Sequence, residues 1–457
     1  MQKAADELRK IMTLTFPDMS FSHRKWVLVT YLMITASASI AQEFRRKEEK
    51  WSFHFQLTGI MQAHPSFDAA YSGDNSLHDS AEHELSLTTT IYLGRRLWKG
   101  AAIYYNPEVA GGSGISGAKG IAGFTNGETF RIGDPAPAFY TARLFLEQEF
   151  SLGNQQDTLY VDADANQLSG YTTRSKLVIR GGKFALSDYF DDNSLCHNPR
   201  TSFFNWSLMS NGAWDYPANT RGYTWSLMAE LILPRWSLRA ATALVPVYAN
   251  GPDLDWHYTK AHSETIEGEY HYTIGRRQGT LRALAYRNVS KAPDYDVAAA
   301  TDKDVIYGKD YGGVKYGFGL NAEQEISDNL GIFVRSSWND GQTATWAFTE
   351  IDRSLSAGIL ATGASWKRPG DRLGIAFVTN GISTPHARFL NSGGYGFIIG
   401  DGKLPDQRGE SIAECFYNAA VFEHCWLTAD YQLVQHPAYN PDRGPVHVFA
   451  ARVHIEF

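Results

Sequence analysis

The chain has 457 residues, a formal net charge of -7 and a mean hydropathy of -0.32. The acidic excess, with no basic stripe to offset it, argues against a nucleic-acid-binding protein. The low mean hydropathy excludes a bundle of membrane helices, because after the amino-terminal leader no segment approaches the roughly 20 apolar residues that a spanning helix needs. The 13% aromatic residues and the 41 glycines are instead typical of strands with interfacial rings and many turns.

The amino-terminal segment carries the three parts of an export signal. A positive region at His23–Lys25 precedes an apolar region from Trp26 to Ile40, and Ser39–Ala41 has the small-x-small pattern of a cleavage site. A membrane anchor is disfavoured, because the apolar run is short and diluted by threonine and serine. We therefore expect residues 1–41 to be a signal peptide and residues 42–457 to be the mature protein, with the true start codon left open.

From Trp51 onward, about sixteen segments alternate between apolar and polar residues. Successive side chains of a strand point to opposite faces, so each segment has one apolar and one polar face. In Tyr223–Leu233, for example, the apolar set begins with Tyr223 and Trp225, and the polar set includes Glu230. Roughly ten residues per segment is the length that crosses a bilayer in a tilted barrel. Clear examples are Phe53–Gln62, His83–Leu93, Phe139–Phe150, Tyr223–Leu233, Lys315–Ile326 and Trp426–Leu433.

The spacers between these segments alternate between short and long. The short ones are tight-turn sequences such as Pro234–Arg235 and Ser327–Asn329. We predict a single all-β domain, a transmembrane antiparallel β-barrel of about 16 strands with long external loops and short periplasmic turns. The segment Thr173–Phe184 and the stretch before it are ambiguous, which leaves eighteen strands open. The long spacers are about Pro107–Ala138, Ala185–Gly222, Pro246–Ser263, Ser290–Val314, Asp340–Arg353, Gly381–Glu410 and Gln435–Pro445.

The carboxyl-terminal segment indicates which face is outside. Its apolar set includes Phe449, Val453 and the final Phe457, and its polar set includes Arg452 and His454. A soluble antiparallel sheet turns its apolar face to the core and its charged face to water. An outer-membrane barrel has apolar residues outside and a wet, polar lumen, and we expect this arrangement here. We therefore expect the protein in the outer membrane of a Gram-negative bacterium.

Several motifs resemble the carbohydrate-selective porin family of OprB type, in the expected order along nearly all of the mature chain. The resemblance implies a 16-stranded outer-membrane channel for sugars. Cys196 and His197 depart from the expected residues of the long loop. The motifs are Gly123–Glu128, Ala142–Phe145, Asp192–Trp206, Asn211–Trp225, Trp338–Gly341, Ile351–Ser354 and Tyr439–Val446.

The longest loop, 185–222, holds the first candidate site residues. Aromatic rings beside charged groups are typical of sugar sites, because rings stack on the apolar face of a pyranose while polar groups bind its hydroxyls. An alternative is that Tyr223 and Trp225 belong to an interfacial girdle and that the other rings only pack the loop. The candidates for substrate binding or for the constriction in this loop are Arg200, Trp206, Trp214, Asp215 and Arg221.

Charged residues on the polar faces of the strands are the second set of candidates. We single out Arg143, Glu147 and Arg180, because rings of mixed charge set the local field of a pore. For any one of them, a solvated lumen residue paired with a neighbour is the favoured interpretation. The other residues expected on this face are Glu149, Glu230, Arg239, Arg282, Glu323, Glu325, Arg335, Asp430, Arg452 and Glu456.

Enzymatic and metal chemistry have little support in the sequence. The histidines fall in no recognised catalytic motif, and Asp191–Asn193 lacks the full signature of a calcium loop. Cys196, Cys415 and Cys425 cannot all pair, and a hairpin near Phe422–His424 places Cys425 opposite Val421 rather than Cys415. We expect no disulfide framework, no metal, no cofactor and no catalytic residue.

The function expected from these observations is passive diffusion of mono- or oligosaccharides into the periplasm. A general porin without sugar preference is one alternative, and a barrel enzyme acting on lipid or envelope polymer is a weaker one. The expected partners are sugars, outer-membrane lipid, lipopolysaccharide and, through Phe457, the barrel-assembly machinery. Nucleic acid is not expected as a partner, and the oligomeric state is left open.

Overall fold

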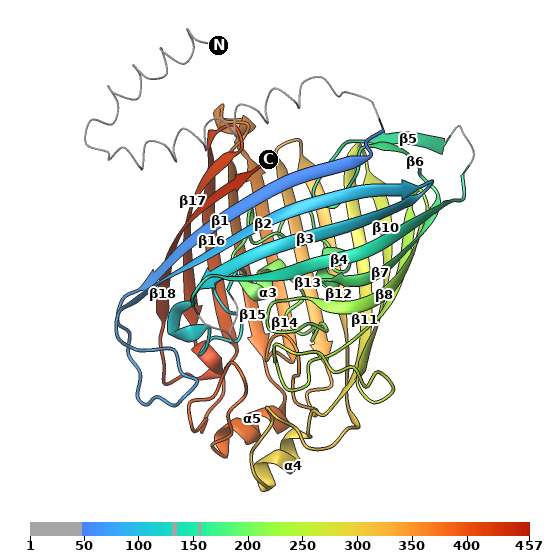
Figure 1. The fold of residues 1–457 in the computed structure, drawn as a ribbon. Helices are drawn as coiled ribbons and strands as arrows, with labels where there is room; N and C mark the ends of the chain where they lie inside the picture. Colours follow the sequence, from blue (N-terminus) through green and yellow to red (C-terminus); the bar gives the residue numbers. More distant parts are fainter. Residues whose placement is uncertain (1–47, 130–134, 154–156) are drawn as a thin grey trace, which may run out of the picture. The chain divides into compact units, whose positions relative to one another are not determined.

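The computed structural model describes residues 48–129, 135–153 and 157–457. Within these residues, sixteen strands pair into a closed antiparallel barrel in which β1 meets β18 (Figure 1). This confirms the predicted fold class. The barrel strands are β1 (Trp51–His64), β2 (Glu82–Trp98), β3 (Ala101–Gly112), β4 (Ala138–Ser151), β7 (Lys176–Phe184), β8 (Thr224–Ile232), β9 (Trp236–Ala243), β10 (His262–Ile274), β11 (Arg277–Ser290), β12 (Gly313–Ser327), β13 (Leu330–Asn339), β14 (Arg353–Thr362), β15 (Arg372–Gly381), β16 (Glu410–Phe422), β17 (Cys425–Gln435) and β18 (Val446–Glu456).

The two faces of the strands follow the predicted alternation. On β18, Phe449 and Val453 are exposed on the outer surface, whereas Arg452 and His454 are fully buried inside. On β8, Leu227 is exposed and Glu230 is buried. The outer face is therefore apolar and the inner face is polar, as in an outer-membrane barrel.

Tyr223 is an exception to the predicted alternation. We expected its ring on the outer face, but it is 6% exposed and its hydroxyl donates to Glu108 inside the barrel. The strand begins only at Thr224, so the two-residue period does not yet apply at Tyr223. Trp225, one residue into that strand, is exposed on the outside as expected.

Connections at the two ends of the barrel differ in length. At one end, turns such as 275–276 and 328–329 join neighbouring strands directly. At the other end, long loops contain α4 (Tyr295–Ala300) and α5 (Thr384–Asn391), which are at the bottom of Figure 1. Short helical turns occur elsewhere in the connections: η1 (Ile115–Gly117), η3 (Leu186–Asp188), α3 (Trp206–Met209), η4 (Gly363–Trp366) and η5 (Pro437–Tyr439).

The ambiguous stretch before Thr173–Phe184 forms a separate structure. Its strands β5 (Thr158–Val161) and β6 (Gly170–Thr173) pair only with each other, in a two-stranded sheet outside the barrel. The next barrel strand, β7, begins at Lys176 rather than Thr173. The two additional strands that the sequence left open are therefore present in the described residues, but they do not enlarge the barrel.

The predicted signal peptide lies outside the described residues. Across the part of the chain that is described, none of the helices combines the length and the apolar character that a membrane span requires.

The three cysteines are all described, and none of them is in a disulfide. Cys415 pairs across the sheet with Tyr431, and Cys425 lies opposite Phe422. The prediction of Val421 as the neighbour of Cys425 was wrong by one residue. The register between β16 and β17 shifts between Ala420 and Phe422, and this irregularity moves the pairing.

Candidate constriction and solute-binding site

The longest loop, 185–223, folds into the lumen, and the inner faces of distant strands hold it there. The backbone N–H groups of Phe204 and Asn205 donate to the Glu414 carboxylate of β16, at 2.6 and 3.1 Å. Arg452 of β18 donates to the carbonyl oxygens of Pro199 and Ser202, at 2.6 and 2.9 Å. These contacts satisfy backbone groups that would otherwise be buried without partners.

The same loop also contacts the opposite wall of the barrel. The backbone N–H of Asp191 donates to Glu267 of β10 at 2.8 Å, and that of Ser194 donates to Glu323 of β12 at 2.8 Å. Arg335 of β13 contacts the Asp191 carboxylate at 3.1 Å. The loop therefore bonds to strands on both sides of the lumen and narrows the pathway between them.

A second inward loop follows β3, and its described part carries Glu128. Gln62 of β1 donates to the carbonyl oxygen of Thr125 at 2.7 Å. The backbone N–H groups of Ala122 and Gly123 donate to Glu410 of β16, at 2.9 and 2.7 Å. These contacts fix the path of the loop and place Glu128 next to the first loop.

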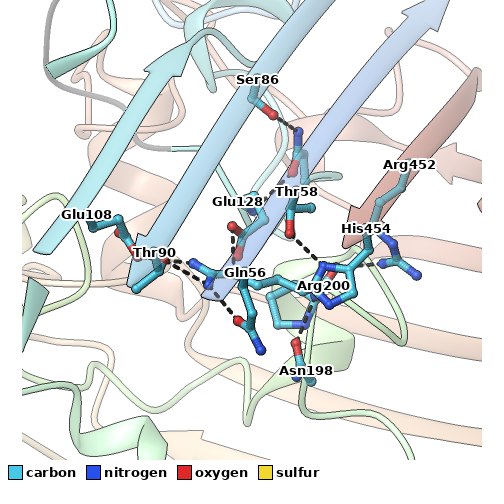
Figure 2. A network of polar contacts seen from close by, with 12 residues as sticks. Gln56, Thr58, Ser86, Thr90, Glu108, Glu128, Asn198, Arg200, Arg452 and His454 are labelled. Atoms are coloured by element: carbon cyan, nitrogen blue, oxygen red, sulfur yellow. Dashed lines mark hydrogen bonds and ion pairs between the residues drawn. The ribbon is translucent and has the colours of Figure 1, made fainter. Parts of the chain in front are cut away.

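Arg200 joins the two loops to the barrel wall. Its Nε donates to Glu128 at 2.9 Å and its Nη2 to Glu108 of β3 at 3.2 Å. Figure 2 shows the guanidinium between these carboxylates and Thr90 of β2. Its Nη1 also contacts Gln56 and Tyr92, at 3.0 and 3.2 Å. The Arg200 side chain is therefore committed to protein acceptors, and its role in substrate binding or the constriction stays a prediction.

A cavity lies between these loops and the wall, with an empty volume of about 670 Å³ that includes space open to solvent. The lining combines acids, guanidinium groups, amides and aromatic rings. The lining residues that matter here are Glu108, Glu128, Tyr140, Arg200, Trp206, Tyr216, Arg221, Tyr223, Asn250 and Phe348.

One wall of the cavity is aromatic. The Trp206 ring stacks on Phe348, with centroids 5.5 Å apart, and Tyr216 packs on Phe348 at 4.4 Å. Trp206 Nε1 donates to the carbonyl oxygen of Asn126 at 2.9 Å, which fixes the indole. The wall is thus a set of rings held in place before any solute arrives.

Asp215 positions this wall from behind. Its carboxylate accepts the backbone N–H groups of Ala347 and Phe348, at 2.8 and 2.9 Å. Asp215 is 1% exposed, and Trp214 beside it is fully buried against Phe190 and Tyr216. Neither residue lines the cavity, and their role in substrate binding or the constriction stays a prediction.

The other wall is polar and centres on Glu108. Tyr140 and Tyr223 donate their hydroxyls to this carboxylate, the latter at 3.2 Å. The Arg221 guanidinium lies over the Tyr140 ring, 4.2 Å from its centroid. A solute in the cavity therefore faces rings on one side and hydrogen-bonding groups on the other.

The predicted strand charges lie in the lumen but outside this cavity. Arg143 pairs with Asp188 at 2.5 Å. Glu147 of β4 and Arg180 of β7 pair at 2.7 Å, and Arg180 also pairs with Glu230 of β8 at 2.7 Å. Together with four ion pairs further round the wall they form a band of alternating charge, which we call the charge band. Those pairs are Arg239–Glu230, Arg239–Glu267, Arg282–Glu269 and Arg282–Glu323.

Of the eight predicted site residues, Arg200, Trp206 and Arg221 line the cavity. The prediction missed Glu108, because it began the long loop at Pro107. The inward alternation of Tyr104, Asn106 and Glu108 is visible in the sequence and continues along β3 to Gly112. No local signal placed Phe348 in the site, because its contacts there are with the distant residues Asp215, Trp206 and Tyr216.

The comparisons with known proteins agree with the fold. Residues 75–457 match the carbohydrate-selective porin, OprB family. The structure of OprB from Pseudomonas putida at high pH aligns with a TM-score of 0.67 and 16% identity, over 89% of this chain and 94% of that one. A likeness at this identity concerns the fold alone.

Two curated relatives match a shorter stretch. Porin AaxA of Chlamydia pneumoniae is 30% identical over 139 residues, which is 30% of this chain and 28% of that protein. Porin AaxA of Chlamydia abortus is 27% identical over 139 residues, which is 30% of this chain and 27% of that protein. The matched stretch thus spans less than a third of these relatives.

The barrel fold and the family match place the protein in the outer membrane of a Gram-negative bacterium. The chain belongs to the carbohydrate-selective porin family of OprB type.

Proposed function

We propose that the protein is a passive pore through which mono- or oligosaccharides diffuse down their own gradient into the periplasm. The observation that carries the proposal is the cavity beside Arg200, where an aromatic wall faces a wall of carboxylates and guanidinium groups. This combination suits a pyranose, which has apolar ring faces and a rim of hydroxyls. No nucleotide-binding motif occurs in the sequence, and diffusion needs none.

In this proposal each wall has its own task. The edges of Trp206, Tyr216 and Phe348 contact the ring faces of the sugar, and each such contact contributes about 0.5 to 1.5 kcal/mol by analogy with aromatic pairs. Arg221 donates hydrogen bonds to the hydroxyls, and Glu108 holds Tyr140 and Tyr223 in the same wall. Arg200 acts as a positioning residue, because it holds Glu108 and Glu128 on either side of its guanidinium.

The balance of charge supports a preference for neutral solutes. Both carboxylates of the cavity are paired with Arg200, and each charge-band residue named above has an opposite partner. Paired charges of opposite sign partly cancel at a distance, whereas a ring of one sign concentrates counter-ions. A neutral sugar gains hydrogen bonds in such a field, and it carries no charge that the pore would have to neutralise.

Two alternatives remain distinct from this proposal. A general porin has the same fold and passes all solutes of one size at similar rates. A barrel enzyme acting on lipid or envelope polymer has no specific observation in its favour. The described residues contain no group of three or more side chains of metal-ligand type that could hold a metal ion.

We also propose the cellular contacts that the sequence implies. Residues 1–41 direct export, and Phe457 is recognised by the barrel-assembly machinery. Trp225 and Trp256 are exposed with ring centroids 6.0 Å apart, as expected of a girdle in contact with outer-membrane lipid and lipopolysaccharide.

Swelling of liposomes that contain the purified barrel tests the function. We expect glucose and a disaccharide to enter faster than an amino acid of glucose size. Equal rates for solutes of one size would support a general porin. Swelling no faster than that of empty liposomes would contradict the pore function. Turnover of phospholipid by protein without pore activity would instead support the enzyme.

A further inference from the structure

One connection at the short-turn end is unlike the others. Residues 152–175 join β4 to β7, and the described part contains the β5–β6 hairpin, whereas most turns at this end span only two or three residues. Tyr160 and Tyr171 pack edge to face with centroids 5.3 Å apart. Figure 1 shows the hairpin at the same end of the barrel as these turns, which is the periplasmic end. We call the segment between its strands, residues 162–169, the exit loop.

The exit loop is fixed to the barrel at its second half. The backbone N–H of Ser169 donates to the Glu49 carboxylate at 3.1 Å. The carbonyl oxygen of Ser169 accepts the backbone N–H of Glu49 and Arg96 Nη2, each at 3.1 Å. Leu168 is 6% exposed and belongs to the buried cluster that contains Tyr104. Burial and hydrogen bonds therefore hold the loop against the inner wall rather than leaving it in solvent.

The tip of the exit loop reaches a fully buried side chain. Asp164 and Gln167 exchange backbone hydrogen bonds at 3.1 and 2.9 Å, and Asn166 has φ +57° in the tight turn between them. Asn106 Nδ2 donates to Asn166 Oδ1 at 2.8 Å. Asn106 is 0% exposed on the inner face of β3, and its Oδ1 has no hydrogen-bond partner within the described residues. A buried acceptor of this kind can be satisfied by an ordered water.

Asn106 also lies close to the cavity described above. Glu108 follows it by two positions on the same face of β3, which corresponds to about 7 Å along a strand. Glu108 is held by Arg200 from the external loop, and Asn106 is held by Asn166 from the periplasmic loop. Loops from both ends of the barrel therefore meet on one patch of the lumen wall.

We propose that the exit loop forms a second contact site for the sugar at the periplasmic exit, in series with the Arg200 cavity. The half-buried amide of Asn166, which Asn106 holds in place from the strand, presents hydrogen-bonding groups to hydroxyls of a solute that leaves the cavity. This inference rests on the proposed pore function. It adds a specificity-determining element that the inward external loops alone do not provide.

A cysteine at the tip of the exit loop tests the proposal. The substitution Asn166→Cys is made in a background without the three native cysteines, and the purified barrel is modified with a bulky, negatively charged thiol reagent. Modification is confirmed by mass before reconstitution. We expect single-channel conductance and disaccharide flux to fall by at least about twofold, because the reagent occupies a narrow part of the pathway.

The matched control is Asp328→Cys, on a turn at the same end where the side chain is 86% exposed. It should be modified fully with no change in conductance or flux. If the modified Asn166→Cys barrel conducts like the unmodified channel, or if the thiol introduced at position 166 does not react, the exit loop is not in the pathway. Either of these two outcomes would contradict the exit-loop site but not the pore function. A wild-type barrel that passes no sugar would contradict both proposals.

Discussion

The Arg200 side chain is the residue on which most of the site depends. Its guanidinium has carboxylates on two sides, Glu108 with 2% and Glu128 with 9% of the side chain exposed. Removing one partner from a buried ion pair leaves an uncompensated charge, and that cost exceeds the loss of the contact itself. Arg200 is therefore expected to determine both the shape and the charge of the cavity.

We predict that Arg200→Ala weakens the block of ion current by a disaccharide by about tenfold, because the cavity wall that Arg200 positions shifts and loses about one charge-assisted hydrogen bond to the sugar, worth about 1.5 kcal/mol. Open-channel conductance should stay the same or rise, and cation selectivity should increase because two carboxylates lose their partner. Titration of current block in planar bilayers measures these effects. Arg277→Ala, at the start of β11 beside the 275–276 turn, is the control. Unchanged block and unchanged selectivity in a folded Arg200→Ala barrel would show that the sugar contacts lie elsewhere.

Phe348 tests the aromatic wall independently of charge. Phe348→Ala removes the ring that stacks on Trp206 and packs on Tyr216. Loss of one ring contact of about 0.5 to 1.5 kcal/mol predicts a disaccharide affinity that is lower by roughly two- to tenfold. Phe348→Leu keeps most of the side-chain volume, so its disaccharide affinity should lie between those of wild type and Phe348→Ala. Identical affinity for all three proteins would contradict a stacking role.

At the scale of elements, the inward loop is the feature that a strand pattern does not reveal. Its contacts join residues far apart in the sequence, as in the bond between Phe204 and Glu414. Alternation predicts where Glu414 points, but it does not predict which loop occupies the lumen beside it. The strands, their faces and the long loops were therefore predictable, whereas the partners of Arg200 and the place of Phe348 were not. The exit loop was missed because β5 and β6 each span only four residues.

The contact between the inward loop and β16 can be tested directly. In Glu414→Ala the backbone N–H groups of Phe204 and Asn205 lose their acceptor, at a cost of about 1 to 3 kcal/mol for each buried group left unsatisfied. We expect a lower melting temperature and noisier, larger single-channel currents than in wild type. Glu325→Gln, at an exposed position of β12, should leave both unchanged. A quiet channel of wild-type conductance in Glu414→Ala would mean that the loop does not depend on this contact.

The external loops contain a carboxylate with a shifted pKa. Asp352 is buried, which alone raises its pKa, but Lys315 and His386 beside it and the backbone N–H of Ser383 outweigh burial, so the pKa lies well below its usual value. A depressed folded-state pKa stabilises the protein above the unfolded value of about 3.9, and this stability is lost as the pH falls through the folded value.

Asp352→Asn should therefore lower the melting temperature at neutral pH, and the difference from wild type should persist down to about pH 4 and shrink below it. Thermal melts followed by tryptophan fluorescence across this range measure the effect. The exposed Asp406 provides the matched control, Asp406→Asn, for which no difference is expected. A difference that grows towards low pH would contradict the role given to Asp352.

At the scale of the whole molecule, the fold assigns each connection to one side of the membrane. Asn391, at the end of α5, is exposed on a long external loop, and Asp328 is exposed on a short periplasmic turn. In a background without native cysteines, Asn391→Cys should react with an impermeant maleimide on intact cells, and Asp328→Cys only after permeabilisation. Labelling of the Asp328→Cys protein on intact cells would contradict the assignment of this turn to the periplasmic side.

The most direct test of the central claim is the current through a single reconstituted channel as a disaccharide is added. A sugar that enters a defined cavity beside Arg200 must block the current reversibly and to saturation, because the site is either empty or occupied. A charged short peptide of similar size should not produce this saturable block. A sugar site beside Arg200 predicts saturation with the sugar alone. A reduction that rises linearly and equally with every solute would show that the pore has no sugar site.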